Sequence, residues 1–157
     1  MTTTGQAAFV AAVSFALGLA PAGAQQRAET LFSREAFASL AWLEGRWVGS
    51  GGGFDAYYEE YRALNDSTWE QRTFPDSTFS TPDGTSTIEW RGGVILKRRG
   101  GTVETRVARI AGDTARFEPV VAGRRGFTWF RVSRDEWRAV LDRPTEPVVY
   151  TLKRFRR

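Results

Sequence analysis

The sequence of 157 residues contains neither cysteine nor histidine. Without cysteine the chain cannot form disulfides, thiolate metal sites, thioether links to haem or a cysteine nucleophile. Without histidine it lacks the usual general base, the commonest metal ligand and any Ser–His–Asp triad. Acid–base chemistry would therefore have to use a lone carboxylate or a tyrosine, and the sequence singles out no catalytic residue.

Lysine is also scarce, because Lys97 and Lys153 are the only lysines and all other basic residues are arginine. The net charge of +4 permits weak attraction to anionic surfaces. An arginine bias of this kind also follows from genome composition. The basic clusters Lys97-Arg98-Arg99 and Arg124-Arg125 lie at or beside expected turns, where charge is normally solvated, so we expect no nucleic-acid partner.

The N-terminus begins with an uncharged apolar run over residues 7–20, which is short for a transmembrane helix. Pro21 ends the run, and Ala22-Gly23-Ala24 has the small-residue pattern of a signal-peptide cleavage site. We therefore expect residues 1–24 to be a signal peptide. The first six residues carry no lysine or arginine, which leaves a retained anchor or a disordered arm as the alternative. An exported chain without cysteine predicts a periplasmic or secreted bacterial protein.

Residues 25–44 are expected to form a polar leader and a short helix. Ser33 is the expected N-cap. Phe37, Leu40 and Ala41 follow at helical spacing, so this face should dock on the rest of the protein. Gly45 can supply the left-handed turn that ends the helix.

Beyond Gly45 the hydrophobic period changes to two, and glycine, proline, asparagine and aspartate separate the short alternating stretches. The pattern predicts an all-β domain over residues 45–157, an antiparallel up-and-down β-barrel of roughly eight to ten strands. Gly49–Gly53 is expected to form a flexible hairpin and not a phosphate loop, because no Lys-Ser/Thr and no helix follow it. Residues 75–84 form either a plain loop or a lid over the barrel mouth, with Phe79 at the centre.

Several short motifs carry a family resemblance. They are Leu40–Leu43, Gly45-Arg46-Trp47 after a short helix, Glu59-Glu60-Tyr61, Trp69-Glu70, and Leu141–Pro144 followed by Pro147–Tyr150. Together they resemble the lipocalin-like bacterial barrels of the calycin superfamily, distant relatives of the nitrobindin and fatty-acid-binding barrels.

The resemblance implies a barrel around a cavity for one small ligand, with Trp47 across the closed end and an arginine of the last strand stacked on it. Alternation along the last strand makes Arg154 the candidate; the alternative is that Arg154 belongs to a solvated basic tail. Nitrobindin-type domains bind haem through a histidine that this chain lacks. We therefore expect no haem, metal or other cofactor.

Aromatic and polar residues on the expected strands are the candidates for ligand binding. They are Tyr58, Glu60, Trp69, Trp90, Arg106, Trp129 and Tyr150. A one-residue error in strand phase reverses every assignment, so Tyr57, Glu59 and Tyr61 are the alternative inward set of the second strand.

The leading expectation is an exported barrel that binds a small hydrophobic or amphipathic ligand without covalent chemistry. The alternatives are a structural or interaction barrel with a filled interior, and a small enzyme that uses a lone carboxylate or tyrosine. An open interior lined by tyrosine and tryptophan would favour ligand binding. An interior filled by these rings would favour the structural role. A buried carboxylate with a raised pKa beside a cavity would favour the enzyme.

Overall fold

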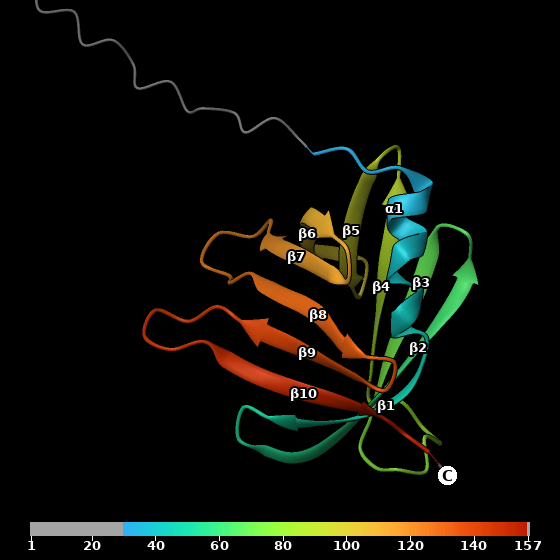
Figure 1. The fold of residues 1–157 in the computed structure, drawn as a ribbon, viewed down its shortest axis with the longest axis vertical. Coiled ribbons are helices and arrows are strands. Elements are labelled where there is room, and N and C mark those ends of the chain that lie inside the picture. The colour runs from blue at the N-terminus through green and yellow to red at the C-terminus, as the bar shows by residue number, and fades with distance from the viewer. Residues whose placement is uncertain (1–29, 157) are drawn as a thin grey trace, which may run out of the picture.

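The computed structural model describes residues 30–156, so the expected signal peptide and most of the leader lie outside the described residues. Ten antiparallel strands form one closed barrel, in which each strand pairs with its neighbours in sequence and β10 pairs with β1 (Figure 1). The strands are β1 (Gly45–Gly51), β2 (Phe54–Asn65), β3 (Thr68–Phe74), β4 (Gly84–Arg91), β5 (Val94–Arg99), β6 (Thr102–Ala111), β7 (Thr114–Pro119), β8 (Phe127–Ser133), β9 (Glu136–Leu141) and β10 (Val148–Arg154).

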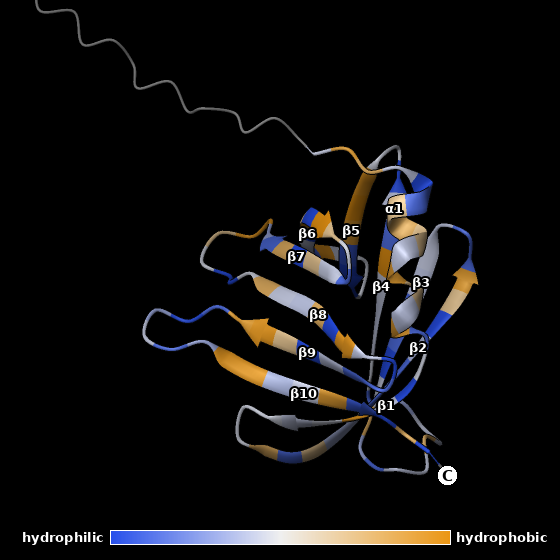
Figure 2. Ribbon diagram, in the orientation of Figure 1, coloured by the Kyte–Doolittle hydropathy of each residue, from blue (hydrophilic) through white to orange (hydrophobic). Residues whose placement is uncertain are grey.

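This topology confirms the expected all-β up-and-down barrel with a short N-terminal helix. Hydrophobic and hydrophilic residues are interleaved along the strands, as the period of two requires when one face is buried (Figure 2). The expected hairpin at Gly49–Gly53 joins β1 to β2, with Gly49–Gly51 at the end of β1 and Gly52-Gly53 as the turn. Among the described residues, no helix is long and apolar enough to span a membrane.

The helical segment consists of α1 (Arg34–Ala38) and a tighter 3₁₀ helix, η1 (Ser39–Leu43). Ser33 caps α1 as expected, since its Oγ accepts a hydrogen bond from the N–H of Ala36 at 3.2 Å. The expected docking face needs a correction, because Ala41 is exposed and Leu43 is fully buried. A 3₁₀ helix has three residues per turn, so Phe37, Leu40 and Leu43 align on one face and leave Ala41 outside.

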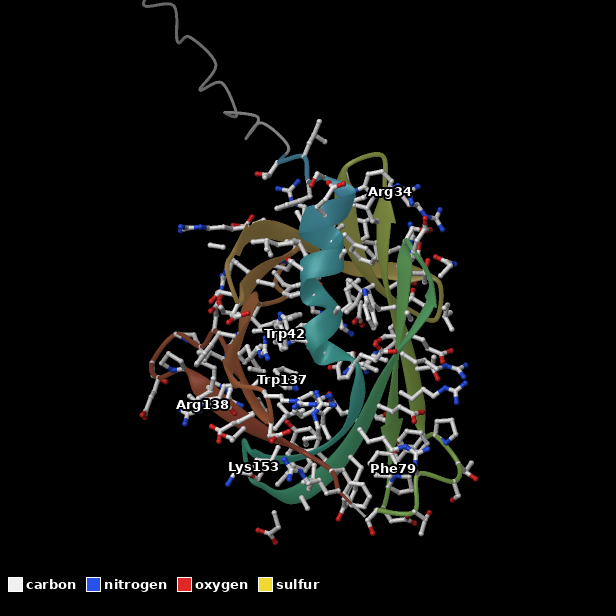
Figure 3. All side chains as sticks on the ribbon, turned by 45° about the vertical axis from the view of Figure 1, so that its right-hand side comes forward. Arg34, Trp42, Phe79, Trp137, Arg138 and Lys153 are labelled. Carbon is white, nitrogen blue, oxygen red and sulfur yellow. The ribbon has the colours of Figure 1, made fainter. Side chains whose placement is uncertain are left out.

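Trp47 of β1 lies directly under this helical segment. Its Nε1–H donates a hydrogen bond of 2.7 Å to the carbonyl of Leu43, and its side chain is buried. Trp137 of β9 packs edge-on against both Trp47 and Trp42, with ring centroids 6.2 and 5.8 Å apart. Figure 3 shows Trp42 and Trp137 beside each other next to the helix. The helical segment therefore closes one end of the barrel with aromatic rings packed edge to face.

Arg154 completes this end from the last strand. Its guanidinium lies over the Trp47 ring at 4.2 Å from the centroid, the placement implied by the family resemblance. Its Nη1 donates a hydrogen bond of 2.9 Å to the carbonyl of Glu44. Gly45 has φ of +121°, which disfavours any side chain, and a Cβ there would lie 2.3 Å from this Nη1 and displace the Arg154 guanidinium from the Glu44 carbonyl.

The long connection between β3 and β4 packs on the outer face of the barrel. Phe79, at its centre, is 7% exposed and contacts the rings of Tyr58, Phe74 and Phe155. Figure 3 shows Phe79 low on the side away from Trp137. Of the two readings of this segment, the structure favours the plain loop, because a lid would have to cover the barrel mouth described below.

Replacing Arg154 by alanine should lower the free energy of unfolding by about 1–2 kcal/mol, since it removes the cation–π contact and leaves the Glu44 carbonyl without its donor. Urea unfolding followed by tryptophan fluorescence measures this change. Lys153→Ala is the matched control, because Lys153 is the exposed neighbour on the same strand. Equal stability of the two variants would contradict a closing role for Arg154.

Candidate functional site

A cavity of about 640 Å³ opens at the end of the barrel opposite the helical segment. The strands run alternately up and down, so the starts of β2 and β8 and the ends of β5 and β9 share one rim, whereas η1 leads into β1 at the other. Residues at that shared rim and on the inner strand faces line the cavity. They are Phe54, Tyr57, Glu59, Tyr61, Gln71, Arg99, Phe127, Trp129, Trp137, Ala139, Leu141, Tyr150 and Leu152.

Aromatic rings form most of the cavity wall and brace one another edge to face. The ring centroids of Tyr57 and Tyr150 are 6.0 Å apart, those of Tyr61 and Trp129 are 5.9 Å apart, and those of Trp129 and Trp137 are 5.4 Å apart. Such contacts fix ring positions as well as bury area. The wall is therefore a rigid surface around an open space.

Gly49 makes room for one of these rings. A Cβ at position 49 would lie 2.1 Å from the ring of Tyr57, its Cα partner on β2. Because Gly49 has no side chain, the Tyr57 ring lies flat against β1 and still faces the cavity. A glycine inside an otherwise alternating strand is the sequence signal for such a close approach.

One carboxylate, that of Glu59, faces this aromatic cavity. Its Oε2 accepts a hydrogen bond of 2.8 Å from the hydroxyl of Tyr61, two residues along the same strand face. Gln71 of β3 supplies a second hydrogen bond to the same carboxylate. Both partners also line the cavity, so polar groups are gathered on one part of an otherwise apolar wall.

The polar groups continue behind Gln71 across two further strands. Ser86 of β4 donates a hydrogen bond of 2.8 Å from its Oγ to Oε1 of Gln71, and Lys97 of β5 donates one of 2.8 Å from Nζ to Ser86 Oγ. Because Gln71 accepts at Oε1, its NH₂ group remains to donate to Glu59. Lys97, Ser86, Gln71 and Glu59 thus form a chain with every donor pointing from β5 towards β2, which we call the polar chain.

Burial shifts the pKa values at both ends of the polar chain. Desolvation raises the pKa of Glu59, opposed by the Tyr61 hydrogen bond and the positive charge of Lys97. Desolvation lowers the pKa of Lys97 to about 8, helped by the like charge of Arg99 and opposed by Glu59 and Glu104. Desolvation also raises the pKa of Tyr61, so Tyr61 stays a hydrogen-bond donor at neutral pH.

Four of the seven predicted ligand-binding residues lie on the inner side or at the closed end of the barrel. Trp129 and Tyr150 line the cavity. Trp69 is buried in the core and is not among the lining residues. Trp90 lies at the closed end, where its Nε1–H donates to the carbonyl of Phe32 and the Arg34 guanidinium lies 4.8 Å from the centre of its ring.

The other three, Tyr58, Glu60 and Arg106, lie away from the cavity, which corrects their expected phase. Tyr58 packs on Phe79 of the outer loop, Glu60 binds Arg46 at 2.8 Å, and Arg106 lies 3.9 Å from Glu118.

The phase of β2 was ambiguous because each face of this strand offers a tyrosine followed by a glutamate. The alternative set of Tyr57, Glu59 and Tyr61 is the one that lines the cavity. The additional tyrosine on that face was the available signal, and Gly49 opposite Tyr57 was a second one.

Sequence reasoning also left Lys97 among the solvated basic residues at turns. In the structure Lys97 is 6% exposed and lies on the inner face of β5, two residues from the core residue Ile95. Alternation with Ile95 was the signal that could have placed it inside.

The rim of the cavity carries arginines beside exposed apolar side chains. A second hollow of about 530 Å³ shares Phe127 and Leu141 with the cavity and is lined also by Arg124, Arg125 and Arg143. Phe54 at the same rim is 60% exposed. Within residues 30–156, no cluster of three or more carboxylates has the arrangement of a metal site.

No family model and no curated protein sequence matches the chain. Among solved structures, a redesigned β-barrel aligns with 75% of this chain and 96% of its own length, at 11% sequence identity and a TM-score of 0.37. At that level the alignment says nothing about activity.

Replacing Lys97 by methionine should change how stability depends on pH. The pKa of Lys97 is about 8 in the folded protein and has its ordinary value of 10.5 in the unfolded chain. Between pH 8 and pH 10.5 the unfolded chain therefore binds more protons than the folded protein. The free energy of unfolding of the wild type should therefore rise by roughly 2 kcal/mol between pH 7 and pH 10 relative to Lys97→Met. Urea titrations at several pH values measure the difference.

Lys153→Met is the control, because Lys153 is exposed and should leave the wild-type pH dependence intact. Parallel curves for wild type and Lys97→Met would show that Lys97 is not desolvated.

Proposed function

We propose that this barrel binds one small, largely apolar molecule in its cavity without covalent chemistry. The observation that carries the proposal is the open cavity of about 640 Å³ with aromatic walls. Ligand sites in proteins typically have volumes of roughly 300–1,000 Å³ and few polar groups. A barrel with a purely structural role would fill this space with side chains, as the closed end does around Trp47 and Trp137.

The biological setting of this binding is also part of the proposal. The helix, the Gly45-Arg46-Trp47 motif and the stack of Arg154 on Trp47 support placing the chain among the lipocalin-like calycin barrels. The apolar N-terminal run and its cleavage pattern support export to the periplasm or beyond. The arginines at the rim favour amphipathic ligands and weak attraction to anionic surfaces.

Filling the cavity tests the proposal. Ala139 lies on β9 between Trp129 and Tyr150, its Cα partners on the neighbouring strands, and lines the cavity. Ala139→Phe should weaken binding of the neutral fluorescent probe N-phenyl-1-naphthylamine by at least about tenfold, because the added ring occupies the ligand volume. The increase of probe fluorescence on titration with protein gives both affinities.

Ala63→Phe is the matched control, since Ala63 is exposed on β2 and the same added ring would lie in solvent. This variant should bind the probe like the wild type. Probe binding that survives Ala139→Phe unchanged, or no binding by the wild type, would refute the cavity as the site.

Glu59 favours a second candidate, an enzyme that transfers protons. A carboxylate with a raised pKa, hydrogen-bonded by Tyr61 and facing a cavity, has the features of a general base. The simplest reaction is removal of a proton from the carbon beside a ketone, which gives the protonated carboxyl and an enolate. The carboxyl exchanges its proton with solvent and then returns a solvent-derived proton to the enolate carbon, which regenerates both the carboxylate and the ketone.

This second candidate predicts that the protein accelerates exchange of the α-protons of 2-tetralone in deuterated water, followed by proton NMR. Glu59→Gln should reduce the rate to that of buffer, because the amide cannot accept the proton. A wild-type rate equal to that of buffer would argue against the enzyme and leave ligand binding unaffected.

A further inference from the structure

The polar chain is unusual because it places a charged group, Glu59, in the wall of an apolar cavity and buries a second one, Lys97, behind that wall. Glu59 and Lys97 carry opposite charges, yet they are joined only through Gln71 and Ser86 and form no direct ion pair. Buried charges held this way cost stability, since hydrogen bonds offset desolvation only in part. A core of apolar residues would close the barrel equally well, so the arrangement needs another explanation.

The carboxylate of Glu59 still has capacity to accept hydrogen bonds. An ionised carboxylate offers about four lone-pair positions, and within residues 30–156 its donors are Tyr61 and Gln71. Tyr61 donates from β2, the strand on which Glu59 lies, and Gln71 donates from the neighbouring strand β3. Because Glu59 also lines the cavity, its remaining acceptor positions are the ones that a bound molecule can reach.

The charges around Glu59 decide which kind of donor fits. Arg99 lines the same cavity, and the positive charges of Lys97 and Arg99 both act on Glu59. Arg99 lines the cavity and Lys97 lies behind Gln71 and Ser86, so a cationic ligand would be repelled by two nearby positive charges. A neutral hydroxyl group meets no such repulsion. The hydrogen bond that a hydroxyl donates to a carboxylate is charge-assisted and therefore strong.

We infer that the cavity selects neutral, largely aromatic molecules that carry a hydroxyl group, and that this hydroxyl donates a hydrogen bond to Glu59. The aromatic walls hold the apolar body, and Tyr61 and Gln71 orient the carboxylate towards the hydroxyl. Lys97, through Ser86, orients Gln71 so that its NH₂ group faces Glu59. This inference rests on the proposed ligand-binding function and adds the chemical class of the ligand.

A pair of probes that differ at the hydroxyl tests the inference. We expect the wild type to bind 2-naphthol at least about tenfold more tightly than 2-methoxynaphthalene, because the ether cannot donate a hydrogen bond. Quenching of the fluorescence of Trp129 and Trp137, which line the cavity, reports both affinities in the full-length protein.

The variant Glu59→Gln should reduce this preference to less than about twofold, chiefly by weakening the binding of 2-naphthol. The matched control is Glu60→Gln, on the outer face of the same strand, which should keep the tenfold preference. Because the ether is also larger than the alcohol, the loss of preference in Glu59→Gln separates hydrogen bonding from size.

The outcomes distinguish this inference from the proposed function. Equal binding of the two probes by the wild type, or a preference that survives in Glu59→Gln, would overturn the role of Glu59 and leave the ligand site standing. No binding of either probe would count against the aromatic ligand site itself. Tighter binding of the cation 1-naphthylmethylammonium than of 2-naphthol would overturn the selection of neutral ligands. If Glu59→Gln does not fold, the wild-type comparison of the probes still decides.

Discussion

The contact between Trp47 and Arg154 is the interaction on which the rest of this barrel depends. These residues are Cα partners across β1 and β10, the pair of strands that closes the sheet. The guanidinium covers one side of the indole while the indole N–H binds the carbonyl of Leu43, so the first strand, the last strand and the helical segment meet at one side chain. A barrel has no free edge only while its first and last strands stay paired. Contacts that hold this seam therefore protect all ten strands.

Closing one end tightly allows the other end to stay open. The rings of Trp137 and Tyr61 belong to both regions, since they pack in the buried core and also line the cavity. The wall of the cavity is thus an extension of the closed end and inherits its rigidity. A rigid wall lowers the entropy cost of binding because few side chains must be ordered by the ligand. The barrel thus keeps a cavity open and forgoes the apolar contacts that side chains filling this space would have made.

Strand alternation and turn residues were enough to predict the antiparallel barrel, because both signals are local. The helix was predicted with its cap, but its last turn was assigned the wrong face, since nothing local reports the change from 3.6 to three residues per turn that exposes Ala41.

The site was harder to predict than the fold for a related reason. On β2, Tyr58 and Glu60 have the same side chains as Tyr57 and Glu59, so the local pattern offered only the additional Tyr61, and pairing with β1 sets which face points inward. Lys97 was missed because its charge suggested solvent, whereas Ser86 and Gln71, distant in sequence, provide its buried partners.

The polar chain links what the cavity binds to how its groups ionise. Desolvation raises the pKa of Glu59, so the protein bears a cost for keeping this carboxylate charged. A hydroxyl that donates to Glu59 stabilises the charged form and lowers that cost, and by linkage the charged form binds the hydroxyl more tightly. Lys97 acts in the same direction from behind Gln71, since its positive charge also favours the carboxylate. The buried network therefore destabilises the empty barrel, and a ligand whose hydroxyl donates to Glu59 offsets part of this destabilisation. A ligand without such a donor does not, so the desolvation of Glu59 favours hydroxyl-bearing ligands.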